Sequence, residues 1–240
     1  MSIALVSDLH LDPGDPAGLE RLSRFADDLP DATRALWILG DLFAAWIGDD
    51  AEDAAACCVR DVLRRLADRG VRCHLMQGNR DFLLGEHFAG ACGARLVDDP
   101  HVLDTGALRV LLTHGDALCT DDVAYQRVRT QLRDPATQAA LLTRSREDRQ
   151  ALARAAREKS RTDGANKPSA IQDVTQDAVD AMLDETACEL MVHGHTHRPA
   201  EHRWRTASGE RRRVVLGDWQ APQVRWAWIE GDSLTLRRWR

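Results

Sequence analysis

The chain has 240 residues, of which 44% are hydrophobic and 29% are charged, and its formal net charge is −6. A length of this order suits one domain, or one domain with an insertion. The acidic balance argues against the broad basic surface of a nucleic-acid-binding protein, and no apolar stretch is long enough to cross a bilayer. We also expect no signal peptide, because Asp8 and His10 fall where a long apolar segment would be needed.

The first half of the chain alternates predicted strands with predicted helices. Short apolar runs predict buried strands, and amphipathic spacing predicts the helices between them. The expected strands are 3–6, 35–39, 71–76, 102–103 and 108–112, and the expected helices are 17–29 and 51–69. The last two strands flank Thr105 and Gly106 and are expected to form a hairpin.

The pattern changes after residue 120. Residues 121–161 are polar and helical with little strand character, which predicts an inserted helical cap. Pro168 can open a further helix that runs to about Ala187. Strands are expected in the rest of the chain, at 190–192, 202–206, 213–216, 224–229 and 233–238.

These elements predict an α/β fold, a four-layer αββα sandwich of two mixed sheets with an inserted helical cap. We place the core at residues 1–120 and 168–240, and the cap at residues 121–167. The six cysteines follow neither a zinc-thiolate nor a disulfide spacing. This favours a reducing compartment, in which most of them act as small hydrophobic side chains.

Five predicted strands each end in a short polar turn. The turns read Asp-x-His, Gly-Asp, Gly-Asn-Arg-Asp, His-Gly-Asp and His-Gly-His-Thr-His, beginning at Asp8, Gly40, Gly78, His114 and His193. Ligands bind at the carboxyl ends of strands in α/β sheets, so these side chains should meet at one edge. One such turn alone is more often an ordinary turn, but five together favour a metal site. Carboxylate, imidazole and amide donors suit Mn²⁺, Fe²⁺ or Zn²⁺, and their number suits two ions.

The same turns, in this order, resemble the motifs of the calcineurin-like metallophosphoesterases from Asp8 to His197. Where that family usually has a histidine in the third motif, this chain has Arg80. With this arginine and an inserted segment that contains Lys159 and Ser160, the sequence resembles one subgroup of the family, the UDP-2,3-diacylglucosamine pyrophosphatases of lipid A biosynthesis. A guanidinium keeps its proton, so Arg80 is expected to clamp a pyrophosphate and not to act as a general acid.

The resemblance implies a role for each candidate residue. One ion would be held by Asp8, His10 and His197, and the other by Asn79, His114 and His195, with Asp41 bridging them. The catalytic residues would be Arg80, Asp41 and His114, and His193 is expected to support the ligands. The implied substrate-binding residues are Asn79, Arg80, Asp122, Tyr125, Ser160, Gly164, Asn166, Lys167 and His195. Without the resemblance, Asp122 and Ser160 are expected to be helix caps.

The activity that the resemblance implies is hydrolysis of the pyrophosphate bond of UDP-2,3-diacylglucosamine. The products would be 2,3-diacylglucosamine 1-phosphate (lipid X) and UMP, and two divalent ions, Mn²⁺ in this subgroup, would activate the water. Two alternatives stay open. One is a general nucleotide or UDP-sugar pyrophosphatase or phosphodiesterase of the same fold, and the other is a metal-bound scaffold without turnover.

The expected partners are the lipid-linked nucleotide sugar and the inner-membrane surface, with no nucleic acid, no obligate protein partner and a monomeric state. The expected location is cytoplasmic and peripheral, on the cytoplasmic face of that membrane. Residues 145–161 carry arginines beside Leu152 and several alanines, a pattern that can bind anionic lipid. The alternative is a helix whose arginines pair with Glu147, Asp148 and Glu158 on its own surface.

Overall fold

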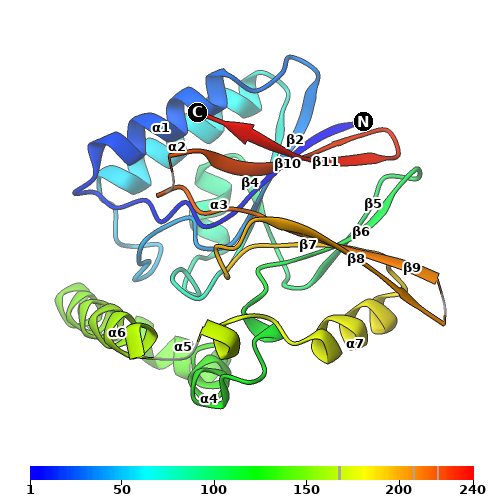
Figure 1. Ribbon diagram of the computed structural model, residues 1–240. Coiled ribbons are helices and arrows are strands. Elements are labelled where there is room, and N and C mark those ends of the chain that lie inside the picture. Colours follow the sequence, from blue (N-terminus) through cyan, green and yellow to red (C-terminus); the bar gives the residue numbers. More distant parts are fainter. Residues whose placement is uncertain (167–168, 208, 221) are drawn as a thin grey trace.

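The computed structural model describes residues 1–166, 169–207, 209–220 and 222–240, and the strands within these ranges form two sheets (Figure 1). The first sheet has the order β11–β10–β1–β2–β3–β4 and the second has the order β5–β6–β7–β9–β8. The strands of the first are β1 (Ser2–Val6), β2 (Thr33–Leu39), β3 (Arg72–Met76), β4 (Ala94–Val97), β10 (Val224–Glu230) and β11 (Ser233–Trp239). Those of the second are β5 (His101–Asp104), β6 (Arg109–Thr113), β7 (Leu190–His193), β8 (Ala200–Thr206) and β9 (Gly209–Val215).

Helices cover the outer face of each sheet. Helices α1 (Pro16–Asp27), α2 (Ala54–Asp68) and α3 (Glu86–Ala91) pack on the first sheet. Helix α7 (Gln176–Thr186) packs on the second, where Val179 and Leu183 contact Leu111 and Met191. Each sheet contains both parallel and antiparallel pairs. The order of helices, sheet, sheet and helix confirms the predicted four-layer αββα sandwich of two mixed sheets.

The alternation of side chains along β1 explains why its sequence is apolar throughout. Ala4 and Val6 face the helices that cover the first sheet, whereas Ile3 and Leu5 face the space between the two sheets. All four are at most 1% exposed. A strand covered on both faces needs apolar residues at every position, and it is therefore an uninterrupted apolar run rather than an alternating one.

Three further helices lie together to one side of the sheets (Figure 1). They are α4 (Val123–Leu132), α5 (Pro135–Leu142) and α6 (Arg146–Asn166), and they occupy the segment for which the sequence predicts helix. Asp122 and Asp134 cap the first two through hydrogen bonds to backbone amides. Among the described residues, neither α4 nor α5 contains a buried side chain. Helices α4 and α5 are therefore attached to the rest of the molecule by side chains that stay at least partly exposed.

Two predictions of secondary structure need correction. The helix expected from Pro168 to Ala187 begins only at Gln176, after a 3₁₀ turn at Ser169–Gln172, and Pro168 itself lies outside the described residues. Thr175 has an extended backbone and its amide donates to the carbonyl of Leu118 at 2.9 Å, so this stretch is tied to the loop after β6. The short elements α3 and β4 were not expected, because six- and four-residue segments contain too little periodicity to detect.

Candidate metal centre

The five polar turns meet at one edge of the two packed sheets. Strands β1, β2 and β3 are parallel neighbours in the first sheet, and β6 and β7 are parallel neighbours in the second. Their carboxyl ends therefore point the same way within each sheet, and the turn that follows each strand carries a predicted ligand. Contacts reported below join all seven predicted ligands, namely Asp8, His10, Asp41, Asn79, His114, His195 and His197.

The backbone of these turns is strained in a consistent way. In the described part of the chain, six non-glycine residues have a left-handed backbone, and five of them are predicted ligands. The five are Asp8 (φ 55°), His10 (φ 49°), Asp41 (φ 52°), His195 (φ 65°) and His197 (φ 55°). Such conformations cost about 1–3 kcal/mol each and persist where the surrounding structure enforces them. The strained backbone thus lowers the stability of the fold and directs these side chains toward one another.

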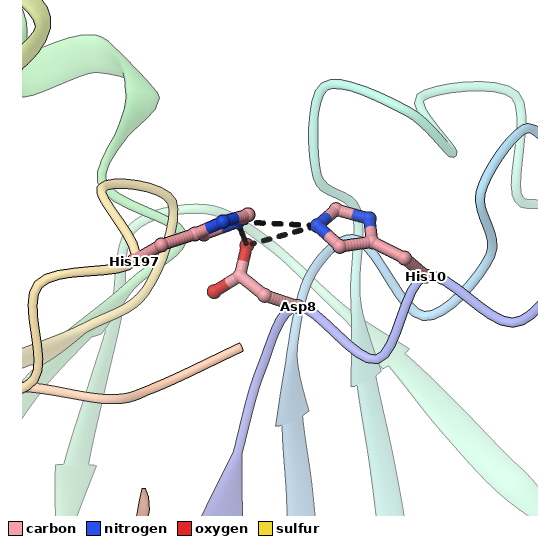
Figure 2. A group of neighbouring side chains, drawn as sticks. All are labelled: Asp8, His10 and His197. Atoms are coloured by element: carbon pink, nitrogen blue, oxygen red, sulfur yellow. Dashed lines mark hydrogen bonds and ion pairs between the residues drawn. The ribbon is translucent and has the colours of Figure 1, made fainter. Parts of the chain in front are cut away.

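Asp8, His10 and His197 form the first group of donors (Figure 2). The Nε2 atoms of His10 and His197 are 3.1 Å apart, and Asp8 Oδ1 lies 3.9 Å and 3.4 Å from them. Asp8 Oδ1 is buried and has no hydrogen-bond partner among the described residues. The other oxygen of Asp8 accepts from Ser7 Oγ at 2.7 Å and from the amide of His195 at 2.9 Å. A buried free oxygen facing two imidazole nitrogens fits a bound cation.

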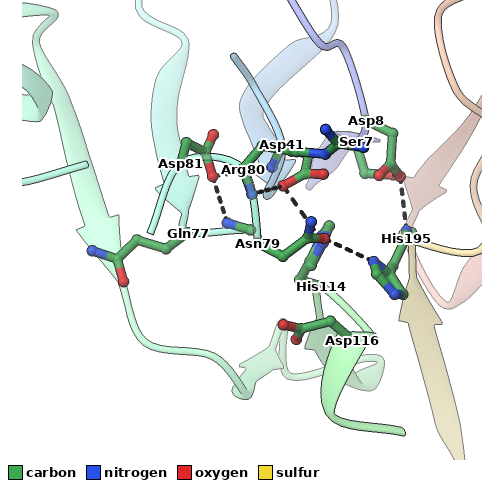
Figure 3. A network of polar contacts seen from close by, with 12 residues as sticks. Ser7, Asp8, Asp41, Gln77, Asn79, Arg80, Asp81, His114, Asp116 and His195 are labelled. Carbon is green, nitrogen blue, oxygen red and sulfur yellow. Dashed lines mark hydrogen bonds and ion pairs between the residues drawn. The ribbon is translucent and has the colours of Figure 1, made fainter. Parts of the chain in front are cut away.

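Asn79, His114 and His195 form the second group (Figure 3). Asn79 Oδ1 lies 3.0 Å from His114 Nε2 and 2.9 Å from His195 Nδ1. His114 Nδ1 lies 2.9 Å from the carbonyl oxygen of Leu39, to which it can donate. That hydrogen bond fixes the tautomer of the ring and leaves the Nε2 lone pair for a cation.

Asp41 lies between the two groups and faces both. Its Oδ2 is 3.7 Å from His10 Nδ1, and its Oδ1 is 3.7 Å from His114 Nε2. The side chain is almost completely buried. The turn approaches Gly78 so closely that a Cβ at that position would lie 2.1 Å from Asp41 Oδ1, which requires glycine. One carboxylate with an oxygen toward each donor group is the arrangement of a bridging ligand.

Burial and mutual interaction shift the ionisation of these groups. Burial raises the pKa of Asp41 to about 7. Burial alone would lower the pKa of His114, but the carboxylates of Asp41 and Asp8 outweigh it and raise that pKa to about 9. The same carboxylates attract a cation, so a metal ion would take the place of the proton on Nε2. Burial is also the main reason that the pKa of His10 falls to about 3 and that of His195 to about 4. The latter two rings are therefore neutral near pH 7, which is the form that binds a metal ion.

Two acidic residues that support the ligands carried no predicted role. Asp81 is fully buried and accepts from the amides of Gly78 (2.6 Å), Leu42 (2.7 Å) and Asp41 (3.2 Å), so it joins two ligand turns. Asp218 Oδ2 lies 3.6 Å from His197 Nδ1, on the side of the ring away from Asp8. Asp218 follows Leu216 and Gly217 directly after a strand, the same pattern as Gly40-Asp41, and this repetition could have identified it from the sequence.

His193 differs from the other two histidines of its turn. It is fully buried, its Nδ1 lies 2.9 Å from the carbonyl oxygen of Gly194, and its Nε2 accepts from Arg213 at 3.0 Å. Both ring nitrogens are thus occupied by protein atoms. The ring stabilises the turn that follows β7, and neither of its nitrogen atoms is free to bind an ion.

The predicted substrate-binding residues are more dispersed than the ligands. Arg80 is half-buried, and its charge is one of the smaller causes that lower the pKa of His10. The Tyr125 ring stacks 5.7 Å from the His195 ring, and the Tyr125 hydroxyl donates to Asp116 at 2.8 Å. Asp122 accepts from the amide of Tyr125 as a helix cap, and Ser160 is exposed on α6. Gly164 and Asn166 belong to α6, and Lys167 lies outside the described residues.

Helix α6 buries one arginine of the predicted basic strip and leaves Arg146, Arg154 and Arg157 exposed. Arg149 is only 5% exposed and pairs with Asp50, and Arg157 pairs with Asp12. The prediction of an exposed strip is therefore wrong for Arg149. Arg149 and Arg157 pair with Asp50 and Asp12 of the core, and for these two arginines the partners differ from the predicted ones on the helix itself.

Comparison with known proteins agrees with this geometry. The family model for calcineurin-like phosphoesterases matches residues 1–199. A protein of Hahella chejuensis named UDP-2,3-diacylglucosamine hydrolase is 43% identical over 219 residues, covering 91% of this chain and 90% of its own. Proteins with the same name from Stenotrophomonas maltophilia (91% of each chain) and Marinobacter nauticus (97% and 94%) are each 44% identical.

Among solved structures, the zinc complex of Vps29 from Entamoeba histolytica aligns with 99% of this chain and 98% of its own. The identity is 12% and the TM-score is 0.46. The family match spans every turn of the metal centre, and the sequence relatives extend the match over more than nine-tenths of the chain. This chain belongs to the calcineurin-like phosphoesterase family, together with the UDP-2,3-diacylglucosamine hydrolases.

Proposed function

We propose that this protein hydrolyses the pyrophosphate bond of UDP-2,3-diacylglucosamine and releases UMP and 2,3-diacylglucosamine 1-phosphate. The observation that supports this most is the 43–44% identity, over at least 91% of the chain, to proteins named for that activity. The donor groups at the sheet edge would supply the chemistry that such a reaction needs, and Arg80 would supply a fixed positive charge. In this role the protein would act in lipid A biosynthesis.

The residues at the sheet edge would hold two divalent ions. Asp8, His10 and His197 would hold one ion, Asn79, His114 and His195 would hold the other, and Asp41 would contribute to both. The mixture of carboxylate, imidazole and amide oxygen suits Mn²⁺, which we propose as the native ion. When bound, such a pair of ions supplies a nucleophilic water at neutral pH and neutralises charge on the phosphate oxygens.

Arg80 would bind the pyrophosphate and stabilise the negative charge that develops on it. Its guanidinium remains protonated and can donate paired hydrogen bonds to phosphate oxygens. A phosphate leaving group needs little protonation, so the reaction does not require the histidine that related enzymes have at this position. The backbone of Arg80 is fixed on both sides, since its amide donates to Asp41 Oδ1 at 2.7 Å and its carbonyl accepts from Trp46 at 3.0 Å. The backbone of Arg80 is therefore held directly beside the carboxylate of Asp41.

The lipid part of the substrate implies work at a membrane surface. No helix in the described ranges is long and apolar enough to span a membrane. We propose a monomer that associates peripherally with the cytoplasmic face of the inner membrane, without nucleic acid or an obligate protein partner. Exposed apolar side chains on α4–α6 support the association; they are Val123 (56%), Val128 (46%), Leu142 (46%) and Leu152 (42%).

The deciding experiment compares two substrates that share the UDP group. Protein freed of metal with EDTA is reloaded with Mn²⁺, and UMP release is followed from UDP-2,3-diacylglucosamine in detergent micelles and from UDP-N-acetylglucosamine. We expect turnover of the lipid substrate only, dependent on Mn²⁺, with 2,3-diacylglucosamine 1-phosphate formed in equal amount. Equal rates on both substrates would instead support a general nucleotide pyrophosphatase. Bound ions without turnover of either substrate would support a scaffold.

A further inference from the structure

Arg149 on helix α6 inserts into the loop that follows the Asp41 turn. Its Nη1 donates to Asp50 Oδ1 at 2.7 Å and its Nη2 donates to Asp50 Oδ2 at 2.5 Å, which is a paired, fork-like contact. The guanidinium also donates to the carbonyl oxygens of Ile47 and Arg144. These bonds explain how an arginine can be 95% buried on a helix that is otherwise mostly exposed. The Arg149 hydrogen bond holds the pKa of Asp50 well below its usual range.

Gly48 provides the space that this arginine occupies. Its backbone is left-handed, with φ at 126°. A Cβ at this position would lie 2.4 Å from Arg149 Nη1 and 2.8 Å from a methyl carbon of Leu142. The loop is thus shaped around side chains of α5 and α6, both by its conformation and by the absence of a side chain.

Hydrogen bonds also join the same loop to the segment that carries Arg80. The amide of Trp46 donates to the carbonyl of Arg80 at 3.0 Å, and the Trp46 indole donates to Asp49 at 3.0 Å. Asp49 in turn accepts from the amides of Gly85 and Phe88 at 2.9 Å and 2.8 Å. These hydrogen bonds hold the loop against the segment that carries Arg80 independently of its contact with α6.

A second contact lies further along α6. Arg157 Nη1 is 3.2 Å from Asp12 Oδ2, and Asp12 lies two residues after the ligand His10. Eight residues of α-helix span about 12 Å. Helix α6 thus runs between the loops that follow two ligand turns, one at Asp8–His10 and the other at Asp41. This helix therefore borders two of the loops that continue from the ligand turns.

We propose that Arg149 is a positioning residue that fixes α6 beside the metal centre through Asp50, so that the diacylglucosamine half of the substrate finds its binding surface preformed. The identity of that substrate half rests on the proposed function. Without the contact, α6 has to be ordered when substrate binds, and the cost appears as weaker binding. The ligands belong to other elements, so binding of the ions does not depend on Arg149.

The test compares Arg149→Gln with Arg154→Gln, which removes the same charge from an exposed site on the same helix. For Arg149→Gln we expect KM for the lipid substrate to rise about tenfold with kcat within twofold of the parent. Bound metal, measured by mass spectrometry, should stay at two ions per chain, and amide hydrogen exchange should accelerate across residues 146–166. Arg149→Lys, which retains charge but not the fork, should recover part of the binding. Arg154→Gln should match the parent in every measurement.

Two further variants change the core residues that contact Arg149. Asp50→Asn removes the Arg149 pair and also the contact of Arg146 Nε with Asp50 Oδ2 at 3.2 Å, and it should raise KM as well. The double variant should cost less than the sum of the two single changes, because both remove the Arg149–Asp50 interaction. Gly48→Ala should accelerate exchange in α6 without changing either charge. Unchanged KM and unchanged exchange in Arg149→Gln, or loss of ions from it, would overturn the proposal. Metal content and exchange need no turnover, so these two measurements decide the role of Arg149 even if the proposed substrate is wrong.

Discussion

The ligand turns and the helices α4–α6 are built on opposite principles. In the turns, every predicted ligand side chain contacts another, and five of the seven ligand residues have a left-handed backbone that the sheets enforce. The described helices α4 and α5 contain no buried side chain, and α6 is held by Arg149 and Arg157. We propose a division of labour, in which the turns would supply the chemistry and the helices would select what can bind beside it.

One buried residue connects the two regions. Asp116 lies two residues after the ligand His114, and its Oδ2 accepts from the Tyr125 hydroxyl at 2.8 Å and lies 3.0 Å from Arg129 Nε (Asp116 appears below His114 in Figure 3). Tyr125 and Arg129 both belong to α4. This helix is therefore fixed to a ligand turn, whereas α6 is fixed to loops one step further from the ligands. Substitutions in the ligand turns should therefore have larger effects on metal binding and turnover than substitutions in the helices.

The largest effect is expected for Asp41→Ala, which tests the core side of the comparison. Loss of the bridging carboxylate should release both ions and reduce kcat by more than about 1000-fold. Metal content per chain and UMP release measure the two consequences separately. Asp61→Ala removes an exposed carboxylate from α2 and should change neither. A variant at position 41 that keeps two ions and turns over at the parent rate would show that Asp41 is no bridge.

A smaller effect is expected for Asp81→Asn. The new amide group must point at least one N–H toward a backbone amide, so buried donors lose their acceptor at a cost of about 1–3 kcal/mol. For a chain of this size, each kcal/mol should lower Tm by about 2–4 °C. Displacement of the Asp41 turn should also weaken metal binding about 10- to 100-fold.

The control for this variant is Asp68→Asn, which changes an exposed carboxylate at the end of α2. Thermal unfolding with and without Mn²⁺ separates the loss of stability from the loss of affinity. If Asp81→Asn lowers Tm but binds the ions as tightly as the parent, Asp81 supports the fold alone and the turns are less tightly coupled than the comparison holds.

The smallest effect is expected at the exposed valines of α4. The double change Val123→Ser and Val128→Ser should reduce binding to phosphatidylglycerol-containing vesicles about fivefold, because two partly inserted apolar side chains are lost. Co-sedimentation with vesicles measures this, and turnover in detergent micelles should stay near the parent rate. Ala124→Ser serves as control on the same helix. Undiminished sedimentation of the double variant would remove α4 from the membrane contact.

Sequence analysis recovered the features that are local in the chain. A buried strand followed at once by polar residues is visible in a short window, and all five ligand turns have this form. Asp81 had no predicted role because its partners are backbone amides brought near by folding, whereas the pattern before Asp218 repeats that before Asp41 and could have been recognised. Arg149 was misjudged for a related reason: its partner Asp50 is 99 residues away, and an alanine- and arginine-rich helix has no clear apolar face.

The position of β1 has a consequence for the order in which the molecule can form. This strand pairs with β2 on one side and with β10 on the other, and its Asp8 meets His195 across 187 residues. During synthesis the first strand emerges long before its second neighbour, so the centre of the sheet stays open until nearly the whole chain has left the ribosome. Neither donor group can be complete before residue 195, and the ions can enter a finished site only at that late stage.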